Sequence, residues 1–231
     1  MNRIKQMLQN ELSGWKSWEI CWLLFSCIII IIVSIGCKDT VMGIVSATTG
    51  VAYVILMGKG KLSAYFFGLI NCVLYAIISY KTAFYGETML NVFYYIPMQF
   101  VGFYTWSRNM NFETKEVSKR HMATRKRIIM LVAICILVVA YAFLLKHMGD
   151  LLPLIDSFTT VVSVAAMFIS IGMYAEQWWL WGAVDAMSVV MWGIAYAKGN
   201  TSIATLLMWM IYFVTAIIMC VKWEREIRKA N

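Results

Sequence analysis

Residues 178–192 read WWLWGAVDAMSVVMW. Steps of three and four residues along this run reach Trp178, Trp181, Asp185, Ser188 and Trp192, which therefore share one face of a helix. The residues between them are mostly Leu, Ala, Val, Met and Gly, so the helix is apolar enough to lie in a membrane. A carboxylate in such a run is costly to expose to lipid. We therefore expect Asp185 to face protein, water or a ligand.

The rest of the chain is also strongly apolar. Of its 231 residues, 61% are hydrophobic and 14% are charged, and the mean hydropathy of +0.72 excludes an ordinary soluble domain. A transmembrane helix needs roughly 17–25 mainly apolar residues. Eight windows meet this requirement, at residues 18–36, 40–58, 62–80, 89–106, 128–145, 157–174, 178–197 and 201–222. The sequence thus predicts an all-α integral membrane protein with eight transmembrane helices.

The basic residues follow the predicted topology. A pI of 9.2 is compatible with nucleic-acid binding, but sixteen of the 20 Lys and Arg residues fall on one side of the eight-span scheme. The opposite side holds only Lys38, Lys81, Lys146 and Lys198. This positive-inside bias predicts cytoplasmic N- and C-termini and no nucleic-acid partner. The basic residues of the long cytoplasmic loop, 107–127, are expected to anchor it to anionic lipid.

Cysteine and histidine do not indicate metal or redox chemistry. The six cysteines are scattered through or beside the spans without a CxxC pair, and we interpret them as small apolar residues. The histidines, His121 and His147, lie in loops far apart in the chain, and there is no HExxH spacing. We therefore expect neither a metal site nor a cofactor.

The N-terminal region, residues 1–36, is predicted to be an amphipathic segment followed by an extra transmembrane helix. Ile4, Met7, Leu8 and Leu12 recur at helical spacing, which suits a short helix on the membrane surface or, equally, a frayed tail. The first span has a basic lead-in but no small-residue cleavage site, so we expect it to be retained and not removed as a signal peptide.

The remaining spans form an internal repeat. Residues 40–106 and 157–223 each contain three spans with short connections, and Asn71 of the first repeat corresponds to Asp185 of the second. Residues 107–145 supply the cytoplasmic loop and a linking helix that restores the orientation of the second copy. The prediction is one N-terminal extra helix followed by a 3+1+3 core of parallel repeats. Ligand sites in such folds lie between the repeats near the midplane.

Three polar residues lie deep in the predicted spans. Asp185 is the only one of the 32 charged residues well inside a span by these boundaries, and no Lys or Arg lies within a span to neutralise it. Asp185 could bind a ligand, take part in gating, or form a structural hydrogen bond to a neighbouring helix. Asn71 and Gln99 are deep enough to meet each other, and Gln99 shares a helix face with Tyr95. Both amides could bind a ligand or join helices.

The tryptophans divide into two groups. Those near predicted membrane interfaces are expected to be anchors: Trp15, Trp18, Trp22, Trp106 and Trp223. Trp179 points away from the stripe of Asp185 and is also expected to face the interface. Trp178 and Trp181 share that stripe, so we expect them in a binding site, although an interfacial position is the alternative.

Together these residues predict a pocket that is aromatic, rich in amides and slightly anionic. Indole faces and a carboxylate attract a flat cation, while amides can bind a carboxamide or sugar hydroxyls. No basic residue within a span is available to hold a phosphate. The ligand class that fits best is an uncharged or cationic nucleoside-like molecule.

The chain resembles the PnuC family of bacterial nicotinamide riboside transporters. The resemblance rests on residues 68–71, the loop at 85–87, the span from Tyr95 through Pro97 and Gln99 to Trp106, and residues 176–181 with Asp185. It covers about residues 40–223. Its most specific element is the WxxW of Trp178 and Trp181, at the start of the second helix of the second repeat.

The resemblance implies a fold related to that of SWEET sugar transporters and a homotrimer in the bacterial inner membrane. It implies facilitated diffusion of nicotinamide riboside, which is trapped inside the cell by phosphorylation. The WxxW favours this substrate, and the alternatives are another B vitamin, thiamine or riboflavin, or a sugar on the same fold. The implied substrate-binding residues are Trp178, Trp181, Asp185, Asn71, Gln99, Tyr95 and Ser188.

Two other function classes fit less well. A membrane-embedded enzyme that uses Asp185 would need a base, nucleophile or metal cluster beside it, and none accompanies that residue in the sequence. A scaffold without transport activity would leave the polar residues near the midplane without a role. We therefore predict a transporter and not an enzyme.

Overall fold

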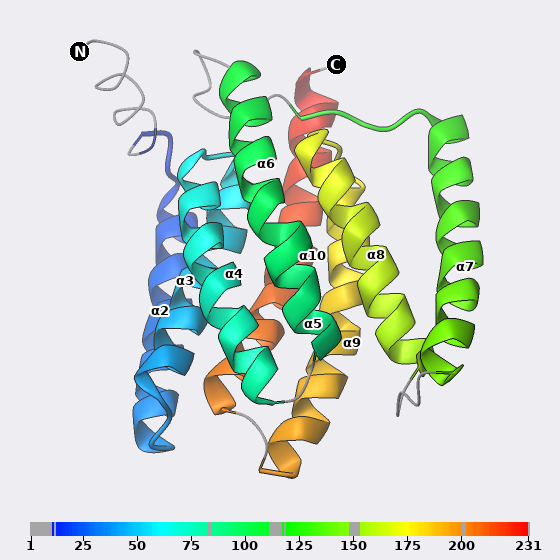
Figure 1. Ribbon diagram of the computed structural model, residues 1–231. Coiled ribbons are helices and arrows are strands. Elements are labelled where there is room, and N and C mark those ends of the chain that lie inside the picture. Colours follow the sequence, from blue (N-terminus) through cyan, green and yellow to red (C-terminus); the bar gives the residue numbers. More distant parts are fainter. Residues whose placement is uncertain are drawn as a thin grey trace.

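The computed structural model describes residues 11, 13–82, 85–110, 117, 119–147, 153–199 and 202–230. Within these ranges the chain is mainly helical, with two isolated β-bridges (Figure 1). The helices are α2 (Ser17–Gly36), α3 (Val41–Lys59), α4 (Ser63–Lys81), α5 (Tyr85–Met89), the π-helix η1 (Leu90–Tyr95), α6 (Ile96–Arg108), α7 (Thr124–His147), α8 (Pro153–Ile171), α9 (Gln177–Ala197) and α10 (Ile203–Ala230). The amphipathic segment predicted around Ile4, Met7, Leu8 and Leu12 lies outside the described residues.

Seven of the described helices are long and apolar enough to cross a membrane. They coincide within a few residues with seven of the eight predicted spans, except that α10 continues beyond residue 222. The eighth span, predicted at 89–106, is the continuous run of α5, η1 and α6. This run begins at Tyr85, so the loop expected at 85–87 is helical instead. The prediction of an all-α membrane protein is confirmed.

The short connections are fixed by helix caps. The Thr40 hydroxyl accepts a hydrogen bond from the backbone N–H of Gly43 and so caps the start of α3 (3.1 Å). Gly60 ends α3 in the left-handed conformation, with φ of 80°, which glycine adopts at no steric cost. Asp39 accepts a hydrogen bond from the backbone N–H of Ala204 (2.9 Å), which ties the link before α3 to the start of α10.

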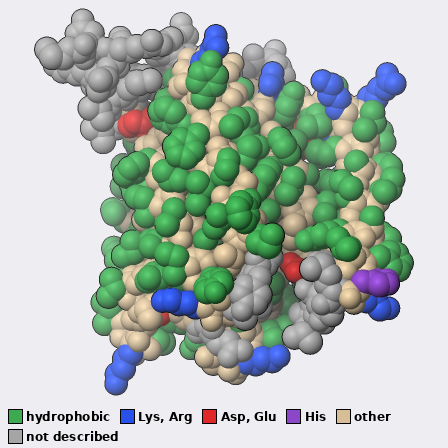
Figure 2. All heavy atoms as spheres, in the orientation of Figure 1, with side chains coloured by type: hydrophobic (Ala, Val, Ile, Leu, Met, Phe, Trp, Pro, Cys, Tyr) green, Lys and Arg blue, Asp and Glu red, His purple; other side chains and the backbone are tan. Residues whose placement is uncertain are grey.

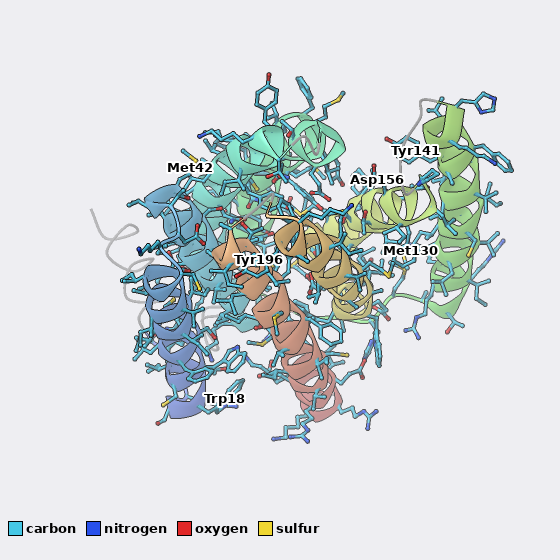
Figure 3. All side chains as sticks on the ribbon, turned by 90° about the horizontal axis from the view of Figure 1, so that it is seen from below. Trp18, Met42, Met130, Tyr141, Asp156 and Tyr196 are labelled. Carbon is cyan, nitrogen blue, oxygen red and sulfur yellow. The ribbon has the colours of Figure 1, made fainter. Side chains whose placement is uncertain are left out.

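Helices α3 and α10 lie in the interior of the bundle. Helix α2 packs on both of them, α4 packs on α3, and α9 packs between α8 and α10. Helix α7 stands to one side and packs chiefly on α8, as Figures 1 and 3 show from two directions. Of its described side chains only Ile134 and Val138 are buried, and the Val138 carbonyl accepts a hydrogen bond from Ser157 of α8 (2.5 Å).

The outer surface fits a membrane protein. Figure 2 shows hydrophobic side chains over the middle of the visible face, with Lys and Arg mainly toward its two ends. Trp179 is among the exposed hydrophobic residues, at 69% exposure, which agrees with its predicted outward direction. Such a surface would be unfavourable in water and is expected where lipid covers the helices.

Two of the predicted interfacial anchors are in fact interior residues. Trp106 and Trp223 are both fully buried. The Trp106 indole donates to the Ser170 carbonyl (3.2 Å), and that of Trp223 donates to the Gly58 carbonyl (2.8 Å). Each indole thus satisfies a helix carbonyl within the bundle, so packing and not the membrane interface fixes its position.

Three basic residues in the described part of the 107–127 loop contact protein groups, whereas Arg125 and Lys126 are exposed, so lipid anchoring stays a prediction for those two. Lys119 forms an ion pair with Glu226, and Arg127 forms one with Glu176. Arg120 donates to the Gly172 carbonyl (3.0 Å) and lies over the ring of Tyr174. The positive-inside pattern predicts that these residues lie on one side of the membrane. It does not reveal that nearby carboxylates pair with them or that nearby carbonyls accept their hydrogen bonds.

Candidate functional site

A cavity of about 70 Å³ lies inside the bundle, where α3, α4, the α5–η1–α6 run, α8, α9 and α10 meet. Six of the seven predicted site residues line it: Asn71, Tyr95, Gln99, Trp178, Trp181 and Asp185. Residues from both predicted repeats therefore meet at one place. Ser188 does not line the cavity, although it is buried.

Helix α9 contributes the two tryptophans of the WxxW and the carboxylate, as its three- and four-residue spacing predicts. The Trp181 indole donates to the Ser170 hydroxyl of α8 (2.9 Å), and its ring centroid lies 6.4 Å from that of Tyr95. The Trp178 indole packs edge-on against Trp223, with 5.8 Å between ring centroids. Its N–H is buried and has no partner among the described residues. Trp181 is therefore fixed by a hydrogen bond, whereas Trp178 is held by packing.

Asp185 is 2% exposed. In the part of the chain that the structure describes, no hydrogen bond or ion pair reaches its carboxylate. Burial without a partner is unfavourable for a carboxylate, and most buried polar groups in proteins are paired. A group left in this condition on a cavity wall is a strong candidate for contact with a ligand or with water.

The two amides line the same cavity but bond to different neighbours. Asn71 donates to the Ser46 carbonyl of α3 (2.8 Å), so it also joins helices, as the alternative interpretation proposed. Gln99 donates weakly to the thiol of Cys72 (3.7 Å), while its side-chain oxygen is buried and has no partner among the described residues. A Cβ at Gly68 would lie 2.6 Å from that oxygen, so the glycine leaves room for the amide.

The π-helix η1 determines which side chains of the fourth span reach the cavity. In an α-helix each step of four residues overshoots a full turn by about 40°, so three such steps would rotate a side chain by about 120°. The wider π-turn, closed by a hydrogen bond from Ile96 N–H to the Asn91 carbonyl, reduces this rotation. Glu87, Asn91, Tyr95 and Gln99 consequently all line the cavity.

Pro97 lies at the second residue of α6, directly after this π-turn. Proline has no N–H to donate to the preceding turn, and its ring crowds the carbonyl four residues earlier. The wide turn is therefore located where an α-helical hydrogen bond is already absent. The Asn91 side chain donates to the Glu87 carbonyl within the same segment (2.8 Å).

Sequence reasoning missed several residues of the site. Glu87 and Asn91 could have been found, because they precede Tyr95 by eight and four residues, but Glu87 was assigned to a loop. The aromatic residues contributed by other helices carry no sequence signal that separates them from ordinary core residues. The missed polar and aromatic residues of the cavity are Tyr53, Tyr75, Glu87, Asn91, Ser163, Trp209 and Tyr212.

Comparisons with known proteins show which family the chain is similar to. A family model described as nicotinamide mononucleotide transporter matches residues 40–225. A nicotinamide riboside transporter PnuC from Neisseria mucosa is 37% identical over 221 residues, which cover 94% of this chain and 84% of that protein. Another, from Haemophilus influenzae, is 27% identical over 233 residues and covers both chains fully.

A solved structure gives the same result at the level of the fold. The crystal structure of the vitamin B3 transporter PnuC matches with a TM-score of 0.87 and 35% identity, covering 97% of this chain and 98% of that one. The predicted resemblance is thereby confirmed. All of these proteins are described as transporters, which also confirms the prediction that the chain is not an enzyme.

Proposed function

The chain belongs to the nicotinamide mononucleotide transporter family, and we propose that it carries nicotinamide riboside across the membrane. The family description names the mononucleotide, whereas the relatives from Neisseria and Haemophilus are named for the riboside. The two molecules share a pyridinium ring, a carboxamide and a ribose, and they differ by one phosphate. The chemistry of the cavity supports the riboside.

The observation that carries this proposal is the combination of aromatic and acidic groups around the cavity. Its lining includes four tyrosines, three tryptophans and the carboxylates Asp185 and Glu87, and none of its described lining residues is Lys or Arg. Aromatic faces and carboxylates attract a pyridinium cation. A phosphate would instead be desolvated beside two acidic groups without a cation to pair with it.

We assign separate roles to the lining residues. Trp178, Trp181 and Tyr95 provide the aromatic wall for the pyridinium ring, and Asp185 offsets its charge. The buried, unpartnered oxygen of Gln99 can accept a hydrogen bond from a carboxamide or a ribose hydroxyl. Asn71 has its N–H group on Ser46 and keeps an oxygen acceptor for the ligand. Ser188 is not included, because it does not line the cavity.

The transport step is proposed to be alternating access by facilitated diffusion. A space of about 70 Å³ holds a few water molecules but is smaller than the roughly 300–1,000 Å³ of typical small-molecule sites. The surrounding helices must therefore separate to admit a nucleoside. Motion of one triplet (40–106) against the other (157–223), with residues 107–145 as the link, would open the site alternately to each side. Phosphorylation inside the cell would then prevent the return of the substrate.

The position in the membrane is part of the same proposal. Sixteen of the 20 basic residues on one side support cytoplasmic N- and C-termini in a bacterial inner membrane. The two described ends of the chain lie at the same end of the bundle (Figure 1), which agrees with an even number of spans. The family resemblance supports a SWEET-related 3+1+3 core and a homotrimer, and light scattering of the purified protein would measure that assembly.

Uptake into proteoliposomes tests the substrate. Labelled nicotinamide riboside should enter vesicles that contain the protein, and excess unlabelled riboside should compete. Nicotinamide mononucleotide, riboflavin and glucose should not compete. Thiamine is the most demanding competitor, because it is also an aromatic cation. Efficient competition by thiamine with weak competition by the riboside would preserve the fold and overturn the substrate.

A further inference from the structure

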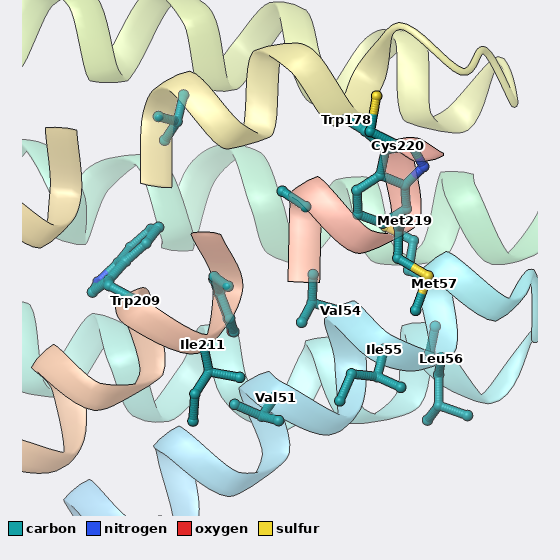
Figure 4. Close-up of a cluster of buried hydrophobic side chains, with 14 of the residues drawn as sticks. Val51, Val54, Ile55, Leu56, Met57, Trp178, Trp209, Ile211, Met219 and Cys220 are labelled. Atoms are coloured by element: carbon teal, nitrogen blue, oxygen red, sulfur yellow. The ribbon is translucent and has the colours of Figure 1, made fainter. Parts of the chain in front are cut away.

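A second cavity, of about 660 Å³, lies on the outer side of α9 and α10. It shares only Trp178 with the central cavity among the described residues. Figure 4 shows Trp178 of α9 close to Cys220 of α10, and both residues line this second cavity. We call it the outer groove. Its lining residues are Trp178, Trp179, Gly182, Ala183, Ala186, Phe213, Ala216, Ile217, Cys220, Val221, Glu224, Arg225 and Arg228.

The outer groove has the length and surface of a site for a lipid chain. Its α10 residues run from Phe213 to Arg228, and at 1.5 Å per residue this is about 22 Å, somewhat more than one leaflet of a hydrocarbon core about 30 Å thick. Glycine and alanine form much of the α9 side, so a chain can approach the helix closely. Ile217 and Val221 are 52% and 45% exposed, so the groove opens toward the space that lipid fills.

The charged end of the groove selects the kind of lipid. Arg225 and Arg228 are both exposed, and no acidic side chain pairs with either in the described part of the chain. Glu224 also lies at this end, but it is near the ring of His121 (3.5 Å). Guanidinium groups bind phosphate oxygens in bidentate geometry. Two free guanidinium groups at the polar end of an apolar groove therefore complement a phosphate head with an acyl tail.

From this combination we propose that the outer groove binds one anionic phospholipid, with its phosphate on Arg225 and Arg228 and an acyl chain along the small residues of α9. The chain would pack against the outer side of Trp178, whose indole also lines the central cavity. Because Trp178 has no hydrogen bond from its N–H among the described residues, packing from both sides determines its position. A bound lipid would thus support one wall of the central cavity.

Native mass spectrometry of the purified full-length protein tests this proposal. Phosphatidylglycerol and phosphatidylcholine of identical acyl composition are titrated separately, and the lipid-bound mass peaks are compared. The wild-type protein should retain phosphatidylglycerol at lower concentration. The double variant R225Q/R228Q should bind it roughly tenfold to 30-fold more weakly, since each basic residue near an anionic lipid contributes about 1 kcal/mol. The variant R125Q/K126Q is the matched control, because it removes two exposed basic residues at the start of α7.

The acyl-chain part of the site has its own pair of variants. A Cβ at Gly182 would meet only Ala216, at 3.8 Å, so Gly182→Leu places its side chain in the groove without displacing backbone. Gly193→Leu lies three helical turns along the same face of α9, where a Cβ would meet Leu206 at 3.9 Å. It is outside the groove and serves as the control. Gly182→Leu should abolish lipid retention, and Gly193→Leu should preserve it.

Three results would overturn the proposal. Equal retention of the two lipids would remove the role of the arginines, and wild-type retention by R225Q/R228Q would do the same. A change in the protein's oligomeric mass with Gly182→Leu, without loss of lipid, would mean that a second copy of the chain covers the groove. Thermal unfolding of each variant without added lipid identifies folding defects, and the Arg pair decides the test if Gly182→Leu does not fold. These measurements do not depend on transport.

Discussion

The bundle contains two groups of buried polar side chains that differ in how their charges are satisfied. At the end of the bundle that holds the first and last described residues, Glu19 of α2 pairs with Lys59 of α3 (2.9 Å) and Lys222 of α10 (2.8 Å). We call these three residues the terminal ion cluster. In the central cavity, by contrast, Asp185 has no such partner among the described residues, and the Gln99 oxygen accepts no hydrogen bond. Both groups are almost completely buried.

We interpret this difference as a separation of structural polar residues from polar residues that bind the ligand. Desolvation is unfavourable for a charged group, and in the terminal ion cluster protein groups of opposite charge offset that cost. In the central cavity nothing in the described protein offsets it, so the cavity is suited to a cation that arrives as a ligand. Mutations in the terminal ion cluster should therefore lower the stability of the fold, and mutations in the central cavity should weaken ligand binding.

The largest effect is expected for Glu19→Ala in the terminal ion cluster. The substitution leaves the ammonium groups of Lys59 and Lys222 buried without this carboxylate, which typically costs about 3–5 kcal/mol. It also removes the bond from the backbone N–H of Lys16 (2.9 Å). Thermal unfolding in detergent should show a large loss of stability. Glu224→Ala, whose one-third exposed carboxylate lies 3.5 Å from the ring of His121, is the matched control and should have a much smaller effect. An equal loss of thermal stability in the two variants would contradict a special role of the terminal ion cluster.

Asp185→Asn should produce the opposite result. The variant keeps the shape of the side chain and removes a charge that no described residue pairs with, so thermal stability should be unchanged or slightly increased. Binding of nicotinamide riboside should weaken by roughly 10-fold to 100-fold, since a hydrogen bond or contact to a charged group contributes about 1.5–3 kcal/mol. Titration with nicotinamide riboside, followed by tryptophan fluorescence, measures the affinity of the wild type and of the variant. A clear loss of stability with unchanged binding would assign Asp185 to the structural group.

Trp181 combines both kinds of interaction, so two substitutions are needed. Trp181→Phe keeps an aromatic face but removes the hydrogen bond to Ser170, and binding should weaken only a few-fold. Trp181→Ala also removes the face, and binding should fall by roughly tenfold or more, since a desolvated cation–π contact contributes about 2 kcal/mol. Uptake should fall in parallel while membrane insertion is retained. Normal uptake by Trp181→Ala would refute the site assignment.

The sequence predicted residues whose type is unusual at their position. Asp185 stood out because a carboxylate is rare in an apolar run, and Trp178 and Trp181 were identified through their spacing from it. Tyr53 and Tyr212 could not be identified, since tyrosine in a membrane span is ordinary and only the packing of α3 and α10 brings both to the cavity. Glu87 was missed because residues 85–87 were assigned to a loop, whereas helix α5 begins at Tyr85.

The terminal ion cluster shows a different limit. Lys59 and Lys222 were interpreted correctly as belonging to one side of the membrane scheme, which depends only on charge and order along the chain. Their burial depends on Glu19, which is 40 residues from one and 203 from the other. Pairing over such distances is a property of the packed bundle. A charge at the end of a predicted span is therefore compatible with a solvated position and with a buried ion pair.

The smallest effect is expected for Ser188→Ala. This substitution tests how far the set of ligand-binding residues extends along α9. The sequence places Ser188 on the stripe of Asp185, one helical turn further on, but it does not line the central cavity. Its hydroxyl is buried and has no partner among the described residues, so removing the oxygen leaves no new unsatisfied group. Riboside binding should change less than about twofold and stability by less than about 0.5 kcal/mol. A tenfold loss of binding would mean that α9 turns during transport and brings Ser188 to the ligand, which would enlarge the site beyond the cavity of this conformation.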